Sequence, residues 1–440
     1  MSVRRARFAF FDRPSVLGRA GRGWTAWLPA AVLAALPALS LYGPKALPGL
    51  VVILIAPALW LCLRERAARP RPPWRIMAAL VGFVGLGAAS ALWSIDPTAS
   101  LTAAAKLAGW AVAATMLFVL WPSVAGRDAG LAERALIGGF AGALILLAVD
   151  LNTDLAVLRL VQVRAKAGTE FYAYSLNRGA TVLALLLCPV GALCLIRWRA
   201  WTAWLAFAAG VAAISLSIST AALLAAILGG ITFALVRWLG RPIIYAMAAV
   251  MAAWLVAAPL VLGPLATSPW LAGLMPQMAP ANYHRLLIWE FAAGRIAERP
   301  MLGWGLDSAR SVPGGRQNLS ARLAERAAPP DDEPQKQDLR SMVFEALPLH
   351  PHSLALQIWL ELGAAGALLA AALIGGAVGA VAAAPSRTGR ASLAGTAAAG
   401  FVVANLSYGA WQSWWVAALI LALAINLALV REPAAAPAQT

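Results

Sequence analysis

Apolar runs of about 20 residues recur along most of this chain, and they constrain its fold more than any other feature. A helix needs about 20 predominantly apolar residues to cross the hydrocarbon core of a bilayer. A membrane β-barrel would show short segments of alternating polarity, and these runs do not alternate. We therefore predict an all-α polytopic membrane protein with about twelve transmembrane helices. The predicted spans are residues 27–43, 47–63, 74–93, 101–121, 134–150, 178–196, 201–218, 219–237, 242–262, 353–383, 391–408 and 411–430.

Composition and charge placement support this class. Hydrophobic residues make up 61% of the chain and charged residues 12%, whereas a soluble domain carries about 25% charged residues. The formal net charge of +16 would fit a nucleic-acid partner only if the basic residues formed a patch. More than half of the 35 basic residues instead occupy connections that share one side if the amino terminus is cytoplasmic. The positive-inside rule predicts this pattern, so we do not expect nucleic-acid binding.

This orientation divides the chain into membrane-embedded and exposed parts. The longest exposed part, 263–352, is an external loop of about 90 residues, and loops longer than about 15 residues are usually functional or disordered. The predicted organisation is a cytoplasmic basic tail (1–26), helices 1–9 (27–262, with an external loop at about 150–177), the large partly helical loop (263–352), helices 10–12 (353–430) and a cytoplasmic tail (431–440).

Cofactor motifs are missing from the sequence. It contains no metal-ligand spacing, Walker loop or dinucleotide fingerprint, so we expect chemistry without a cofactor. The three cysteines, Cys62, Cys188 and Cys194, all fall inside apolar runs and are expected to be small buried hydrophobes.

The middle of the large loop, YHRLLIWEFAAGRIAERP, has apolar residues at helical spacing and ends at Pro300. We expect an amphipathic helix with Arg285 in its first turn, where a cation opposes the helix dipole. A cation there without a local partner points to an anionic ligand. Arg295 lies three residues before Glu298, a spacing that favours a solvated ion pair. Arg178 opens a span from the outside, where arginines also commonly snorkel to the interface.

All three histidines of the chain lie in the same loop, at positions 284, 350 and 352. Histidine titrates near neutral pH, so it is suited to proton transfer at a water-facing membrane edge. A histidine at the start of a helix also often has only a structural role. For His350, flanked by Pro348 and Pro351, we expect mainly positioning of the loop.

At these residues the chain resembles the O-antigen ligase and polymerase family of bacterial membrane glycosyltransferases. One matching stretch is RLLIWEFAAGRIAERPMLGWGLDS, residues 285–308. Another is His352 and Ser353, followed after nine residues by Gly363 and then Gly366. LWSIDPTASL, residues 92–101, is also similar.

The sequence departs from the family at one place. Many members carry a Ser-Arg pair that opens a span in the middle of the membrane domain, whereas this chain has Ser219 and Thr220. Arg178 is our candidate substitute for the missing arginine.

The resemblance implies a glycosyltransferase of the inner membrane with its site on the periplasmic side. Its donor would be an undecaprenyl pyrophosphate-linked glycan, its acceptor the lipid A–core oligosaccharide, and membrane lipids its surroundings. Transfer would invert the anomeric carbon without metal or ATP. His352 (general base) and Arg285 would be catalytic, and the predicted pyrophosphate-binding residues are Arg178, Arg285, His350 and Arg295.

Other functions remain open from the sequence. An O-antigen polymerase or a protein O-oligosaccharyltransferase would use the same scaffold, and no residue pattern separates them from a ligase. A lipid flippase or transporter belongs to a different class. Transporters tend to show internal repeats and charged or broken helices at the bilayer midplane. We find no repeat and few charges within spans, which disfavours this class.

Overall fold

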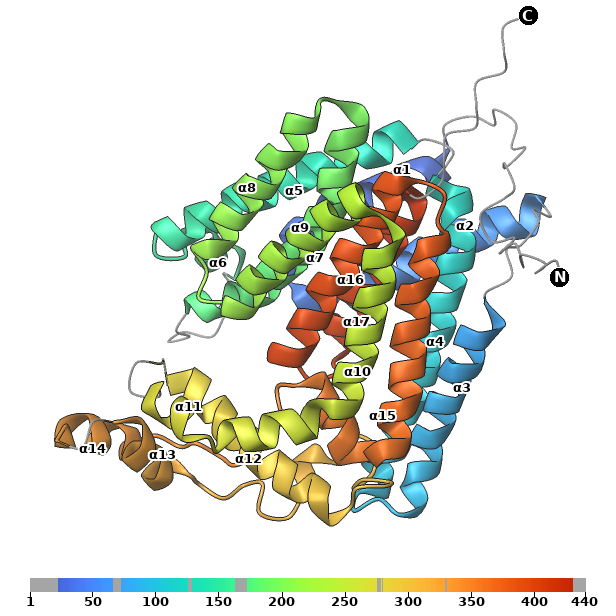
Figure 1. Ribbon diagram of the computed structural model, residues 1–440. Helices are drawn as coiled ribbons and strands as arrows, with labels where there is room; N and C mark the ends of the chain where they lie inside the picture. The colour runs from blue at the N-terminus through green and yellow to red at the C-terminus, as the bar shows by residue number, and fades with distance from the viewer. Residues whose placement is uncertain are drawn as a thin grey trace, which may run out of the picture.

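The computed structural model describes residues 23–65, 73–125, 129–162, 172–274, 278, 280–328 and 331–429 (Figure 1). Within these ranges the protein is helical, with no β-strand and one isolated bridge between Asn318 and Glu345. The main helices are α1 (Trp24–Tyr42), α2 (Leu47–Glu65), α3 (Trp74–Ala89), α4 (Pro97–Ala125), α5 (Ala129–Asn152), α7 (Asn177–Arg197), α8 (Ala200–Ser215), α9 (Thr220–Leu239), α10 (Arg241–Ala266), α15 (Leu354–Ala380), α16 (Arg387–Leu406) and α17 (Ser413–Leu429).

These twelve helices coincide with the twelve apolar ranges predicted from the sequence. In the described part of the chain, eight helical segments are long and apolar enough to cross a membrane, and three shorter apolar helices accompany them. The prediction of an all-helical, multi-pass membrane protein is therefore confirmed. The predicted tails, 1–26 and 431–440, lie almost wholly outside the described residues.

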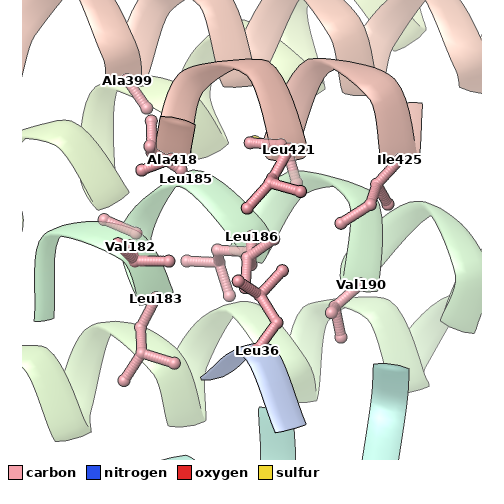
Figure 2. Close-up of a cluster of buried hydrophobic side chains, with 14 of the residues drawn as sticks. Leu36, Val182, Leu183, Leu185, Leu186, Val190, Ala399, Ala418, Leu421 and Ile425 are labelled. Atoms are coloured by element: carbon pink, nitrogen blue, oxygen red, sulfur yellow. The ribbon is translucent and has the colours of Figure 1, made fainter. Parts of the chain in front are cut away.

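The centre of the bundle is α7, whose apolar window is 89% buried. Figure 2 shows Leu186 of α7 between Leu36 of α1 and Leu421 of α17. A helix that is apolar on every side must be surrounded by other helices, and α7 has this character. Cys188 and Cys194 are buried in this core, as predicted, whereas the side chain of Cys62 lies outside the described residues.

A second hydrophobic core forms between α3, α10 and α15 and extends into the large loop. Leu306, Val312 and Leu347 of the loop are buried against Leu255 of α10 and Leu362 of α15. The loop is therefore packed onto this half of the bundle.

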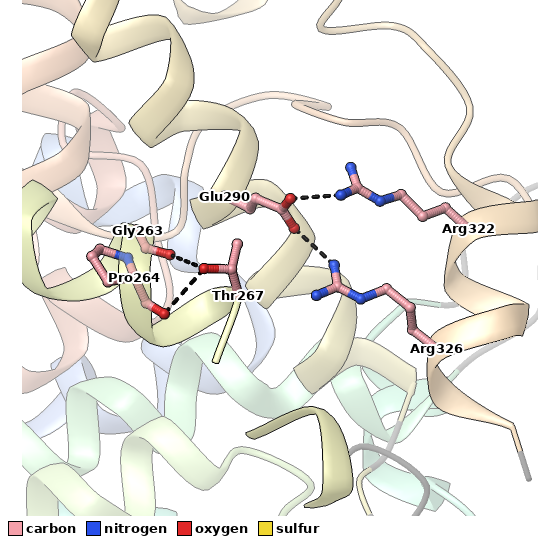
Figure 3. Close-up of polar contacts among 6 residues, drawn as sticks. All are labelled: Gly263, Pro264, Thr267, Glu290, Arg322 and Arg326. Atoms are coloured by element: carbon pink, nitrogen blue, oxygen red, sulfur yellow. Dashed lines mark hydrogen bonds and ion pairs between the residues drawn. The ribbon is translucent and has the colours of Figure 1, made fainter. Parts of the chain in front are cut away.

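The remaining helices of the large loop form a layer across one end of the bundle (Figure 1). Glu290 in this layer accepts bonds from Arg322 (2.6 Å) and Arg326 (2.8 Å), which joins two of its helices (Figure 3). The layer comprises α11 (Pro269–Leu274), α12 (Pro280–Glu298), α13 (Ser320–Ala327) and α14 (Glu333–Ser341), and the shorter α6 (Ala156–Val161) follows α5.

One detail of this layer differs from the sequence-based expectations. The helix α12 begins at Pro280, so Arg285 lies in its second turn and the expectation of a first-turn cation was wrong. Proline favours the first helical position because its fixed φ suits a helix start. The polar segment that follows α13 forms α14, where the side chain of Asp332 caps the N–H of Gln335 at 3.0 Å.

Candidate functional site

Three separate stretches that resemble the family, 92–101, 300–308 and 352–366, meet at the end of the bundle that carries the loop. The backbone N–H of Ile95 donates to the carbonyl of Trp304 at 3.1 Å. The stretch 92–101 therefore supports the turn formed by residues 300–308, which contains Gly303 and Gly305. Further bonds join Trp93 to Leu302 (3.1 Å), Ser100 to Leu306 (2.7 Å) and Leu306 to Ser90 (3.0 Å).

The turn is inserted into a break in α15. At Gly363 the helix leaves helical geometry, with φ 61° and ψ −157°, and this leaves backbone groups on both sides of the break without intrahelical partners. The turn satisfies these groups. Four backbone hydrogen bonds join the turn to α15. The N–H donor and the carbonyl acceptor are, in this order, Trp304 and Leu360 (2.9 Å), Gly305 and Glu361 (2.8 Å), Ala364 and Pro300 (2.8 Å), and Ala365 and Met301 (3.2 Å).

The glycines of both stretches are explained by this close approach. A Cβ atom on Gly363 would lie 2.4 Å from the carbonyl carbon of Met301, and one on Gly303 would lie 2.5 Å from that of Glu361. Both residues also have positive φ, which side-chain-bearing residues rarely adopt. The glycine spacing of the sequence therefore encodes a joint between the loop and the helix.

His352 lies just before α15 in a conformation that is uncommon for a residue with a side chain. Its φ is +54°, in the left-handed region, and such outliers cluster at functional sites. Its Nδ1 lies 2.5 Å from the carbonyl oxygen of Ser407. A carbonyl can only accept, so Nδ1 carries the proton and Nε2 of the neutral ring keeps a free lone pair.

The electrostatic surroundings keep His352 neutral. Burial lowers the pKa of this ring to about 4, the bond to Ser407 acts in the opposite direction, and the nearby cation of Arg285 lowers it further. A neutral ring with a free Nε2 is the form that can accept a proton.

His350 has the opposite tautomer. Its Nδ1 accepts the backbone N–H of His352 at 3.1 Å, so the proton of the neutral ring lies on Nε2. The two rings are 4.3 Å apart between centroids. Burial, followed by the neighbouring His352, lowers the pKa of His350 to about 3. The Nδ1 of His350 thus fixes the backbone that holds His352, while its Nε2 lies 3.5 Å from the side-chain amide nitrogen of Gln412.

Arg285, on α12, acts electrostatically on both histidines. The residues on either side of it in this helix anchor it: His284 Nε2 donates to the carbonyl of Glu345 at 2.8 Å and Trp289 Nε1 donates to that of Pro351 at 3.0 Å. Among the described residues, no carboxylate or other group forms an ion pair or hydrogen bond with Arg285. Burial lowers the pKa of this guanidinium below its ordinary value. The charge is thus partly desolvated and available to an anion.

Arg178 approaches the same place from the first turn of α7. Its guanidinium lies 5.6 Å from the centre of the Trp414 ring, which is its one recorded contact in the described structure. Both Arg178 and Arg285 act electrostatically on the hydroxyl of Tyr408. Burial raises the pKa of Tyr408, whereas hydrogen bonds with Thr181 and Ser407 and then the two arginines oppose this rise. Two cations from different helices therefore act electrostatically on one phenol.

Sequence reasoning missed Tyr408 and the other polar residues between α16 and α17. The segment SYGAWQSWW carries them, and its signal was a cluster of polar and aromatic residues between the last two apolar runs. Ser407 orients His352, and the Tyr408 ring packs edge-on against Trp414 with centroids 4.6 Å apart.

Glu361 is fully buried within α15 and supports this segment. Its carboxylate accepts bonds from Gln357 Nε2 (2.9 Å) and Trp411 Nε1 (2.6 Å), and also from the backbone N–H of Asp307 (2.6 Å). Gln357 in turn accepts the N–H of Ala410 at 2.9 Å. Glu361 therefore connects the turn, the broken helix and the last loop.

Arg295 is engaged elsewhere. It forms the ion pair with Glu298 that its spacing predicts, at 2.7 Å, and its guanidinium lies 5.2 Å from the Phe291 ring centre. No described contact connects it with His352 or Arg178, so the structure brings together four predicted site residues and leaves Arg295 outside them. In the described part of the chain, no group of three His, Cys, Asp or Glu side chains is placed to hold a metal ion.

Comparison with known proteins places this region in a family. Residues 205–371 match the family described as O-antigen ligase, a range that includes Arg285, His350 and His352. A candidate polysaccharide ligase of Rickettsia conorii (strain ATCC VR-613 / Malish 7) is 26% identical over 307 residues, 68% of this chain and 67% of the relative. A relative with the same description from Rickettsia bellii (strain RML369-C) is 28% identical over 271 residues, 60% of each chain. The chain is therefore similar to the O-antigen ligase family over the region that carries the candidate site, and to polysaccharide ligases over about two thirds of its length.

Proposed function

We propose that this enzyme transfers a glycan from undecaprenyl pyrophosphate to the lipid A–core oligosaccharide. The observation that carries the proposal is the pairing of two complementary groups at one place. Arg285 has a partly desolvated charge with no acidic partner in the described structure, and His352 beside it has its Nε2 lone pair free. Sugar transfer from a pyrophosphate needs a cation for the leaving group and a base for the acceptor.

In the proposed reaction, Nε2 of His352 accepts the proton of an acceptor hydroxyl as its oxygen attacks the anomeric carbon. The bond from that carbon to the pyrophosphate oxygen breaks, the configuration inverts and undecaprenyl pyrophosphate leaves. Arg285 and Arg178 stabilise the growing negative charge, since guanidinium groups form paired, charge-assisted bonds with phosphate. The Ser407 carbonyl holds Nδ1–H and so stabilises the protonated ring after transfer.

Tyr408 and His350 extend this arrangement. The Tyr408 hydroxyl lies within the electrostatic reach of both arginines and can donate to a phosphate oxygen between them. His350 presents its Nε2–H, and we propose that it positions the loop and binds pyrophosphate. Arg295 is not part of our proposed phosphate site because Glu298 already neutralises it.

The proposed topology has twelve spans with both ends of the chain in the cytoplasm and residues 263–352 in the periplasm. The support is the concentration of basic residues in the connections on the other side. A cysteine introduced by Gln335→Cys should react with a membrane-impermeant maleimide when only the outer membrane is permeabilised. Labelling that requires lysis of the inner membrane would contradict both the topology and the site.

The deciding experiment incubates purified enzyme with an undecaprenyl pyrophosphate-linked glycan and a lipid A–core acceptor, without ATP or added metal. We expect glycan-bearing lipid A–core on a gel, and no product with His352→Ala. Lengthening of the donor glycan instead would make the enzyme a polymerase. Transfer only to an added acceptor protein would make it a protein O-oligosaccharyltransferase.

A further inference from the structure

The end of the bundle opposite the proposed site carries a pocket among α7, α8 and α9. Its volume is about 140 Å³, and its walls are mainly aromatic and aliphatic. Two of the wall residues, Trp204 and Trp238, are 46% and 65% exposed, so the pocket opens to the outside of the bundle. The lining residues are Leu195, Ala200, Ala203, Trp204, Phe207, Phe233, Arg237 and Trp238.

Arg237 is the one charged residue in this lining. Its Nε is buried and has no hydrogen-bond partner in the described structure. Buried hydrogen-bond donors nearly always have an acceptor, so the unpaired Nε–H of Arg237 indicates an acceptor that is not part of the chain. No lining residue is acidic, so the walls of the pocket supply no counter-charge for Arg237.

More positive charge lies beside the pocket. Arg387, the first residue of α16, donates through Nη2 to the carbonyl of Trp238 at 2.5 Å, which places it at the rim. Arg241 and Arg387 both act electrostatically on Arg390, whose Nε is also buried without a described partner. Four arginines therefore converge on the ends of α9 and α16, and a neutral ligand would not compensate them.

The exposed tryptophans indicate the surroundings of this pocket. Tryptophan is enriched where a membrane protein passes from hydrocarbon to headgroups. Basic pockets between membrane helices at this level bind anionic lipid headgroups. We infer that this pocket binds the phosphate of an anionic phospholipid, with Arg237 as its main ligand and the aromatic walls against the adjoining glycerol and acyl carbons. This site is independent of the proposed transfer reaction.

The inference can be tested on delipidated enzyme by native mass spectrometry with dioleoyl phosphatidylglycerol and dioleoyl phosphatidylethanolamine. We expect phosphatidylglycerol to bind about tenfold more tightly, and Arg237→Gln to lose most of this preference, since one charge-assisted bond is removed. Arg134→Gln, at an exposed arginine outside the pocket, is the matched control and should keep it. Trp204→Ala, a second variant, should also weaken binding.

Three outcomes would overturn the inference. Equal binding of the two lipids would mean that the pocket does not select net negative charge. An equal loss in Arg134→Gln would mean that overall surface charge, and not this pocket, attracts the lipid. Displacement of phosphatidylglycerol by millimolar inorganic phosphate would make this a simple anion site. Glycan transfer measured on each variant checks that the protein remains folded.

Discussion

The two halves of α12 carry the same kind of residue in opposite situations. Arg285 and Arg295 are ten residues apart on one helix. Arg295 is neutralised by Glu298 and covered by Phe291, whereas Arg285 faces two neutral histidines and a tyrosine with no described acidic partner. A guanidinium cannot lose its charge at physiological pH. The half of the helix that leaves its charge uncompensated is therefore the half that we propose binds an anionic substrate.

The largest expected effect concerns His352, the proposed general base near Arg285. General-base catalysis contributes about 10²–10⁴-fold, so His352→Ala should reduce transfer by at least about 100-fold. Donor binding, measured separately with labelled undecaprenyl pyrophosphate glycan, should remain close to wild type. His350→Ala is the comparison variant and should cost much less. If His350→Ala were the inactive variant instead, the roles of the two rings would have to be exchanged.

The next effect tests the uncompensated charge directly. Arg285→Ala should reduce the transfer rate by about 10²–10³-fold, the typical loss on removing one donor to a developing charge. Arg285→Lys should restore little, because an ammonium cannot form the planar paired contact. Kinetic assays on purified variants would measure both. Full activity in the lysine variant would mean that the site needs only positive charge there.

Tyr408 should have a smaller effect. Tyr408→Phe removes one hydroxyl that we place between Arg178 and Arg285, so transfer should fall roughly tenfold, the value of one hydrogen bond to a charged group. Steady-state assays at saturating acceptor would detect this. Since the ring still packs on Trp414, the thermal midpoint should change little. An unchanged rate would restrict the phosphate contacts to the arginines.

The pH profile should be nearly flat across the range in which an ordinary histidine titrates. Because the pKa of His352 is lowered to about 4, the free enzyme should keep its base neutral down to about pH 5, and kcat/KM should fall as the pH approaches 4. The unfolded ring binds a proton near 6.5, so between these values the unfolded state holds more protons. Stability contributed by the neutral ring is therefore present above pH 6.5 and is lost towards pH 4. A kcat/KM that halves at pH 6.5 would contradict this.

The smallest effect should come from the second half of α12. Arg295→Ala removes a partly exposed ion pair, which is worth about 0.2–1 kcal/mol, so transfer should change by less than about twofold. Thermal unfolding and the same transfer assay would measure the two quantities. A loss comparable to that of Arg285→Ala would return Arg295 to the phosphate site and remove the contrast between the two halves.

Local patterns predicted the helices well and predicted the site only in part. Apolar runs identify the twelve main helices because hydrocarbon-facing segments need a uniform composition over many residues. Arg285 was selected because we expected it in the first turn of a helix, and this expectation was wrong. It was also selected because it lacks a local partner, and in the described structure no carboxylate pairs with it. Ser407 and Tyr408 were missed because their importance comes from His352, which Ser407 contacts, and from Arg285, which acts on Tyr408, both more than 50 residues away in sequence.

The break in α15 also could not be derived from periodicity. Gly363 lies in a continuous apolar run, and nothing local reveals that a turn 60 residues earlier fills the gap. The same holds for Glu361, whose partners come from three segments of the chain. Tertiary hydrogen bonds, which have no signature in a single stretch of sequence, determine both features.

The insertion of the 300–305 turn into α15 has a mechanical consequence. Sliding or hinging the loop away from this helix would break four backbone hydrogen bonds at once and expose their groups to an apolar surrounding. The loop base, the first part of α15 and His352 should therefore move as one rigid body. Access for the two lipid-borne substrates of the proposed reaction would then depend on movement of elements outside this rigid body.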